Sequence, residues 1–293
     1  MSSNLILSTV QRMDFGQLQP FLHSLRRHQY SGKIVFFVSG LSAETSQRLV
    51  ESGVELVPFE YFSIRMRRPA LLLWPLWRKR FSRMSTFEEK AALAKRVFFF
   101  MVLRHLLYYE LLTQRTERYD RILLTDSRDV FFQKDPFSTA YESGLHAFLE
   151  GKGRTINTCS ANRQMIVEAF GPEMLGTMGP FEPSCAGVTI GDSDSVIKYL
   201  RKMTELAFEV RTMPMVTGLD QGIHNYIVHQ GLVPQTHLHA NSEGGVLTMG
   251  VMESDEIQRN TDGEVTDAAG QVIPILHQYD RHSEVARRLV AAL

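Results

Sequence analysis

"YDRILLTDSRDVFFQKDPF", residues 119–137, joins an apolar strand to a cluster of carboxylates. The run 121–125 has the composition of a buried strand, and Asp126 and Asp129 follow it directly. Carboxylates at the end of a buried strand are costly unless an arginine, backbone N–H groups or a metal ion compensates their charge. The stretch therefore predicts a charged site at the end of a buried strand, with one of these three as its partner.

Strands and helices alternate in the part of the chain before this stretch. We expect strands at 4–10, 33–38 and 54–59 and amphipathic helices at 14–28 and 42–53. Near-continuously apolar strands that alternate with helices are typical of a mainly parallel sheet flanked by helices on both faces. Neither GxGxxG nor GxxxxGK[ST] follows the first strand, so the dinucleotide fingerprint and the P-loop are absent. The pattern predicts an α/β fold.

The second half continues the pattern with longer helices. A capping box at Ser85 and Glu88 predicts one long helix that runs to about Leu112. Further expected elements are strands at 145–150 and 184–191, helices near 158–169, 193–211 and 218–231, and a β-rich tail over 246–280. The chain shows no repeat and no linker. We therefore expect one domain over residues 1–293.

Composition excludes several classes of function. The 293 residues contain 32 Lys+Arg and 32 Asp+Glu, and this balance argues against general binding of nucleic acid. Two cysteines are too few for a disulfide framework or a four-cysteine zinc site, which favours a reducing compartment. The first residues do not resemble a signal peptide, and no apolar run approaches the ~20 residues that span a bilayer. A cytoplasmic location is expected.

The segment 61–83 interrupts the alternation of strands and helices. It carries seven basic residues and both tryptophans, Trp74 and Trp77, and no acidic residue. One interpretation is an insertion whose residues 65–83 contact an anionic membrane or a large acceptor. The other is a helical excursion that packs on the domain, which is favoured because Pro69 and Pro75 break the amphipathic pattern.

Three explanations compete for Asp126 and Asp129. In the first they are structural, with Asp126 capping a turn and Arg121 or Arg128 paired with Asp129. In the second, an aspartate is the nucleophile of a phosphotransferase, which needs Asp-x-Asp where this chain has Asp-x-x-Asp. In the third, both hold a divalent ion that binds a diphosphate. Residues i and i+3 of a strand face opposite sides, so a shared ion requires a turn at Ser127-Arg128.

The third explanation gains from a resemblance in motif order. The stretch 119–137 resembles the DxD region of GT-A-fold glycosyltransferases. Three later segments are similar to motifs of the retaining glycogenin and lipooligosaccharide galactosyltransferase family. They are "CAGVTIG" (185–191), "LDQGIHNYI" (219–227) and "LHQYDRH" (276–282). The family has Asn where this chain has Cys185. The resemblance implies a GT-A-like (Rossmann-like) α/β fold with a mixed, mainly parallel sheet.

The resemblance also implies site residues. The implied metal ligands are Asp129, His277 and Asp126. His282 competes with His277 for the place of the histidine ligand. Asp126 could instead bind the ribose hydroxyls of the nucleotide. The implied nucleotide-sugar contacts are Ser8, Thr9, Gln11, Arg104, Asp126 and Arg128. The implied catalytic residues, against the sugar, are Asp220 and Gln221, although Asp220 could instead serve the helix N-terminus that it occupies.

These residues together predict a metal-dependent retaining glycosyltransferase. The expected donor is a nucleotide-sugar, above all a UDP-sugar, and the expected cofactor is a divalent cation, Mn²⁺ or Mg²⁺. The acceptor, a glycan, lipid or protein, is not specified by the sequence. Two alternatives stay open, namely a pseudoenzyme that binds sugar nucleotide without turnover and a metal-dependent phosphotransferase.

Overall fold

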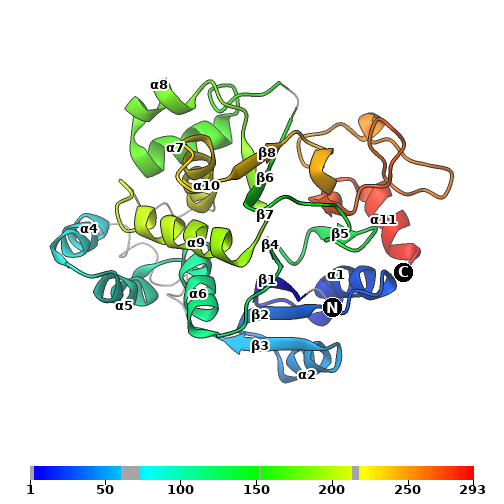
Figure 1. Cartoon of the computed structure of the whole chain (residues 1–293), viewed down its shortest axis with the longest axis horizontal. Helices are drawn as coiled ribbons and strands as arrows, with labels where there is room; N and C mark the ends of the chain where they lie inside the picture. The colour runs from blue at the N-terminus through cyan, green and yellow to red at the C-terminus, as the bar shows by residue number, and fades with distance from the viewer. Residues whose placement is uncertain (1–2, 61–72, 152, 213–217) are drawn as a thin grey trace.

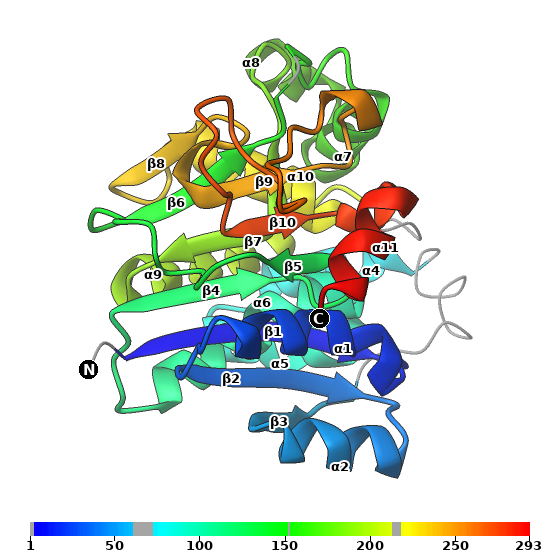
Figure 2. The ribbon, with the colours of Figure 1, turned by 90° about the vertical axis from the view of Figure 1, so that its right-hand side faces the viewer.

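The computed structural model describes residues 3–60, 73–151, 153–212 and 218–293. A seven-stranded sheet lies at its centre (Figures 1 and 2). The strands, in spatial order, are β3 (Val54–Pro58), β2 (Lys33–Ser39), β1 (Asn4–Gln11), β4 (Arg121–Thr125), β7 (Ser184–Gly191), β6 (Leu145–Leu149) and β8 (Thr236–His239). Strand β7 is antiparallel to both of its neighbours, and the other adjacent pairs are parallel. The expected α/β fold with a mixed, mainly parallel sheet is confirmed.

Helices cover both faces of the sheet (Figure 1). On one face Leu5 and Leu7 of β1 share a core with α4 (Trp74–Arg83), α5 (Phe87–Val97), α6 (Phe100–Gln114), α9 (Ser193–Ala207) and α10 (Leu219–His229). On the other face Ile6 and Val10 pack with α1 (Phe15–Arg27) and α2 (Ala43–Glu51). Because successive side chains of a strand point to opposite faces of the sheet, β1 contributes to the hydrophobic core on each face. Among the described residues, none of the helices has the length and apolarity needed to cross a bilayer.

A second, small sheet lies beside the main one. Its strands are β5 (Val130–Phe132), β10 (Ile275–His277) and β9 (Val246–Thr248), in that order. Strand β10 runs antiparallel to β5 and parallel to β9, and the C-terminal helix α11 (Ser283–Ala291) packs on this part of the fold. The small α7 (Ser160–Phe170) and α8 (Leu175–Met178) form a separate layer against α10. The C-terminal tail therefore returns to the segment that follows β4.

The helix expected from Ser85 to about Leu112 is two helices. Its capping box is formed by Thr86 and Glu89, and the helix breaks after Val97, where Phe98 and Phe99 are extended. The break turns the Phe98 ring into a cluster with the rings of α4 and Phe208. Burying such a ring contributes about 1.5–3 kcal/mol, more than the roughly 1 kcal/mol of a helical hydrogen bond. Burial therefore decides the break.

The helix expected over 193–211 is also shorter than predicted. It is α9, which ends at Ala207. The chain then turns toward α7, where the Arg211 N–H donates to Ala169 O over 2.8 Å. A tertiary hydrogen bond replaces the last turn that the local pattern predicts.

Part of the basic segment 61–83 forms α4, while residues 61–72 lie outside the described residues. Pro75 falls in the first turn of the helix, where proline is tolerated because its missing N–H has no partner in the helix. Trp74 is buried, and its Nε1 donates to Val210 O over 3.2 Å. Phe81 is buried as well and stacks on Phe208 at 5.3 Å between ring centroids. Helix α4 is thus packed on the domain through its aromatic side chains.

Replacing Phe81 by Ala is expected to lower the free energy of unfolding by about 3–5 kcal/mol, because the fully buried ring leaves a cavity. The matched control is Leu76→Ala on the same helix. Leu76 is 63% exposed, so its loss should change the free energy of unfolding by less than about 0.5 kcal/mol. Urea denaturation followed by circular dichroism measures both values. Equal values would contradict this packing of α4.

Candidate metal centre

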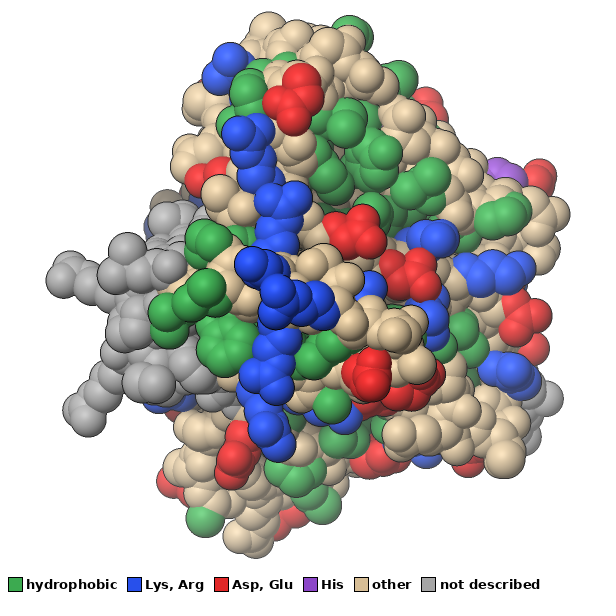
Figure 3. Space-filling model, turned by 90° about the vertical axis from the view of Figure 1, so that its left-hand side faces the viewer, with side chains coloured by type: hydrophobic (Ala, Val, Ile, Leu, Met, Phe, Trp, Pro, Cys, Tyr) green, Lys and Arg blue, Asp and Glu red, His purple; other side chains and the backbone are tan. Residues whose placement is uncertain are grey.

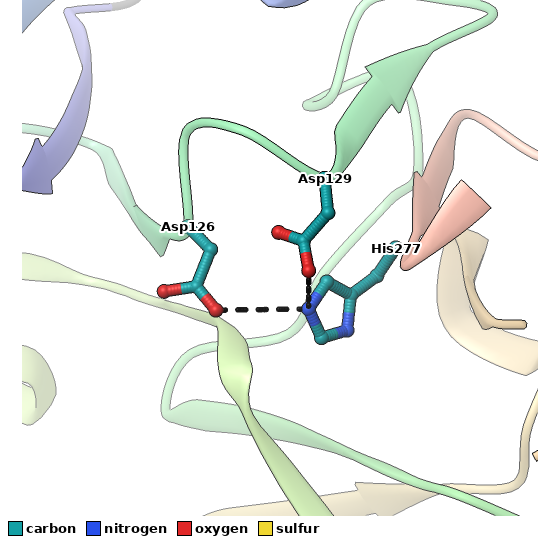
Figure 4. Close-up of side chains that lie close together, drawn as sticks. All are labelled: Asp126, Asp129 and His277. Carbon is teal, nitrogen blue, oxygen red and sulfur yellow. Dashed lines mark ion pairs between the residues drawn. The ribbon is translucent and has the colours of Figure 1, made fainter. Parts of the chain in front are cut away.

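A bend after β4 brings two carboxylates to one place. Asp126 is the first residue after the strand, and the chain bends through 127–129 before β5 begins. The Asp126 N–H donates to Gly187 O of β7 over 2.9 Å, which fixes the start of the bend. Beyond the bend, the side chain of Asp129 lies near that of Asp126 (Figure 4). The turn that a shared ion requires is therefore present.

The third member of the group comes from the C-terminal tail. Strand β10 pairs with β5 so that His277 lies opposite Val130. The next residue, Gln278, donates its N–H to Asp129 O over 2.6 Å. These backbone bonds carry the His277 ring to the two carboxylates, which both point toward it in Figure 4.

Asp126, Asp129 and His277 could together hold a metal ion. His277 Nε2 lies 3.7 Å from Asp126 Oδ2 and 4.0 Å from Asp129 Oδ2. Both distances are longer than a hydrogen bond, whereas two ligands of one ion, each at ~2.1 Å, lie up to ~4.2 Å apart. Nε2 is buried without a hydrogen-bond partner among the described residues. A buried ring nitrogen that faces two carboxylates and has no partner fits a metal ligand.

Gly187 keeps the space between these candidate ligands open. A Cβ atom at this position would lie 2.5 Å from His277 Nε2 and 2.9 Å from Asp126 Oδ2, closer than Cβ atoms come to other atoms. Any larger residue would push the ring or the carboxylate aside. Gly187 lies in "CAGVTIG", the β7 segment, which passes directly beside the end of β4.

The other nitrogen of His277 faces Cys185. Cys185 Sγ and His277 Nδ1 are 3.5 Å apart, and both residues are buried. Such a contact on the far side of the ring would orient it and hold its Nε2 toward an ion bound by the two carboxylates. Burial alone would lower the pKa of His277, but Cys185 and the neighbouring carboxylates outweigh it and raise that pKa above its ordinary value. Cys185 thus has a structural role at the position where the resemblance expects Asn.

Arg104 of α6 ties Asp126 to Asp220. Its Nη1 donates to Asp126 Oδ1 over 2.6 Å and its Nη2 to Asp220 Oδ2 over 2.8 Å. Burial opposes the ionisation of Asp126, yet Arg104 and His277 hold the pKa of this carboxyl well below its usual range. Burial raises the pKa of Asp220 in spite of Arg104. Asp126 therefore remains an anion, and its Oδ2 is left to face the candidate metal position.

The two residues expected to be catalytic begin α10 and have different surroundings. The N-cap of the helix is Gly218, and the buried Asp220 bonds Arg104. Gln221 fastens the helix to β7, because its Oε1 accepts from Ala186 N and its Nε2 donates to Ser184 O, each over 2.7 Å. Gln221 thus positions the strand that carries Cys185 and Gly187.

The residues expected from β1 lie near the carboxyl end of that strand. Ser8 is fully buried, and its hydroxyl has no hydrogen-bond partner among the described residues. The Thr9 hydroxyl shares a 2.5 Å hydrogen bond with Tyr108 of α6, and its carbonyl accepts from Ser127 over 3.4 Å. Gln11 ends the strand and is half-buried. None of these three belongs to the metal group, although they border the same edge of the sheet.

Two other expected residues lie outside the metal group. Arg128 is about half exposed and pairs with Asp280 over 3.2 Å. His282 uses both ring nitrogens elsewhere, toward Ser254 Oγ and Met249 O, each over 2.9 Å. Of the two competing histidines, the structure therefore brings His277 to the carboxylates.

Glu150 is a carboxylate of this region that our sequence analysis missed. It follows β6, which is parallel to β4 because both are antiparallel to β7, so both strands end at the same edge. Glu150 accepts hydrogen bonds from Gln221 Nε2 over 3.1 Å and from Asn162 Nδ2 over 3.4 Å. Burial raises its pKa. The signal was present in "LHAFLE", another apolar strand that ends in a carboxylate.

No family model matches the chain, and no curated protein matches it either. Its chemistry is therefore inferred from the arrangement of side chains. Carboxylates, an imidazole and a buried guanidinium meet at the carboxyl edge of an α/β sheet. This set can bind a hard or borderline cation through oxygen and nitrogen and leaves further positions of the ion for a ligand.

Replacing Gly187 by Ala is expected to weaken binding of Mn²⁺ about 10–100-fold, because the new methyl group displaces His277 or Asp126. The matched control is Gly176→Ala in α8, where an added Cβ meets nothing within 4 Å. That variant should bind Mn²⁺ like the wild type. Calorimetric titration with MnCl₂ measures both affinities, and unchanged binding by the Gly187 variant would contradict the assignment of this site.

Proposed function

We propose that this chain is a metal-dependent glycosyltransferase that uses a nucleotide-sugar donor, in the first place a UDP-sugar. The observation that carries the proposal is the Asp126–Asp129–His277 group, which lies where the DxD resemblance expects a metal. The same group argues against a purely structural role for the aspartates. Arginine accounts for Asp126 and Asp220, whereas Asp129 has no arginine or lysine partner among the described residues.

The position of the group in the sheet supports a nucleotide site. The chain adds β2 and β3 on one side of β1 and then crosses to the other side to form β4, so the strand order reverses at β1. In open α/β sheets, ligands bind at the carboxyl ends of the strands where the strand order reverses. Asp126 follows β4 at that edge, and Gln11 ends β1 there. A nucleotide on β1 would place its diphosphate near the metal group.

A division of labour follows for the residues of the site. Asp126, Asp129 and His277 would hold the cation, and their oxygen-rich set with one imidazole suits Mn²⁺ or Mg²⁺. When bound, this ion would neutralise the donor diphosphate and make the nucleoside diphosphate a better leaving group. Arg104 keeps Asp126 ionised and fixes its orientation.

The carboxylate of Asp220 is the group that we assign to the sugar. A retaining transfer passes through a state with positive charge on the anomeric carbon, and a fixed carboxylate stabilises that charge. Asp220 is held by Arg104 and by the start of α10, so its carboxylate has a fixed orientation. Gln221, the next residue in the chain, donates from its Nε2 to Glu150 and so holds a second carboxylate in the same region. Retention of configuration is part of this proposal.

UDP together with Mn²⁺ is expected to raise the melting temperature, since a ligand that binds only the folded state stabilises it by about 2.7 kcal/mol at 100 times its Kd. EDTA should abolish the gain, because the diphosphate is held through the ion. Differential scanning fluorimetry with UDP, GDP and ADP measures the effect. No stabilisation by any of these nucleotides would refute the donor site.

Asp129→Asn and Asp220→Asn should separate binding from turnover. Without the Asp129 charge the protein should lose stabilisation by Mn²⁺ and UDP. Asp220→Asn should keep that stabilisation, lose about 1.5–3 kcal/mol of stability from its bond to Arg104, and turn over about 10²–10³-fold more slowly. Release of sugar from UDP-glucose and UDP-galactose measures turnover.

The same assay distinguishes the alternatives. A pseudoenzyme would bind UDP and release no sugar in the wild type. A phosphotransferase would release phosphate from a phosphomonoester and leave the UDP-sugars intact. Wild-type turnover by the Asp220 variant would show that this carboxylate serves only to pair with Arg104.

A further inference from the structure

Helix α4 presents opposite kinds of side chain on its two faces. Phe81 is buried on the inner face. On the outer face Leu76 is 63% exposed, the highest exposure among the large apolar side chains of the described residues. Lys79, Arg80 and Arg83 follow Leu76 at the spacings i+3, i+4 and i+7, which share one face of a helix, and all three are exposed. The outer face of α4 therefore carries one exposed apolar side chain next to three cationic side chains.

The three cationic side chains of this face form no ion pair with the rest of the described chain. On the neighbouring helix α5, Lys95 pairs with Glu110 over 2.7 Å. In contrast, no ion pair joins Lys79, Arg80 or Arg83 to another described residue. The chain as a whole has no net charge, so this local excess of positive charge is not a by-product of a basic composition.

The side of the molecule on which α4 lies carries many basic side chains. Figure 3 views the side of the molecule on which α4 and α5 lie in Figure 1. Lys and Arg side chains form a nearly continuous band across it, with hydrophobic side chains beside the band. A band of this kind matches an extended anionic surface better than a single small anion.

We propose that the outer face of α4 docks the protein on an anionic lipid bilayer. Leu76 inserts between the headgroups, while the stems of Lys79, Arg80 and Arg83 lie along the apolar boundary and their charged ends reach the lipid phosphates. An exposed leucine among the cations favours lipid over nucleic acid, whose backbone offers phosphates and no apolar layer. The neutral chain also lacks the overall positive charge that nucleic-acid binding uses.

Vesicle sedimentation tests this proposal. The wild type should bind vesicles of phosphatidylcholine with about one-third phosphatidylserine, and should bind pure phosphatidylcholine vesicles much more weakly. The variant K79E/R80E/R83E should bind the anionic vesicles at least about a hundredfold more weakly, since each cation contributes about fivefold near an anionic leaflet. Leu76→Ser should weaken binding about tenfold.

A matched control removes the same charge elsewhere. Arg118, Lys134 and Arg287 are exposed and lie on other segments, so R118E/K134E/R287E should bind anionic vesicles far better than the α4 variant. Melting curves check that each variant folds, and Leu76→Ser keeps the test valid should the charge variant unfold. Equal binding by the two triple variants, equal binding to neutral and anionic vesicles, or no vesicle binding by the wild type would overturn the proposal. Displacement from vesicles by single-stranded RNA that depends on α4 would assign the face to nucleic acid instead.

Discussion

One guanidinium compensates two carboxylates that lie on different elements, the buried Asp220 and the partly exposed Asp126. Arg104 on α6 bonds Asp126 at the end of β4 and Asp220 at the start of α10. Removing one partner from a buried pair such as Arg104–Asp220 typically costs about 3–5 kcal/mol, so this pair favours one placement of α10 relative to α6. The second bond, to the partly exposed Asp126, joins both helices to the end of β4. The helix layer is thereby fixed to the edge of the sheet. Because Arg104 uses only one oxygen of Asp126, the same carboxylate serves both the core and the candidate metal group.

A carboxylate at this edge of the sheet can be compensated by an arginine, by backbone N–H groups or by a metal ion. The charges that meet here indicate which of these act. One arginine cannot balance Asp126, Asp129 and Asp220, and Asp129 accepts no bond from Arg104. Without an ion, the imidazolium form of His277 supplies part of the missing charge, since its pKa is raised by its neighbours against the effect of burial. A divalent ion would displace that proton and supply the rest. Arginine and a metal ion together account for the carboxylates better than either does alone.

Local patterns predicted the elements, and long-range contacts decided how they meet. The bounds of β1, α1, β2, α2 and β3 agree with the sequence to within a few residues because each depends on its own periodicity. The break of the helix at Phe98 was not predicted from the sequence, because it depends on contacts of the Phe98 ring with rings of α4 and with Phe208. In the site, Asp126, Asp129 and His277 were predicted. The bond from Cys185 to His277 and the space kept by Gly187 arise from strand pairing that no local pattern carries.

The metal group depends on a pairing between segments that are far apart in the chain. Strands β5 and β10 have three residues each, and strands of this length are marginal by themselves. Their register nevertheless sets the position of His277 relative to Asp129, since a slip by one residue would turn the ring to the other side. An ion bound to Asp126, Asp129 and His277 would cross-link β10 to the bend after β4. Binding of the ion and docking of the C-terminal tail would therefore stabilise each other. The cation would then stabilise the folded state in addition to binding a ligand.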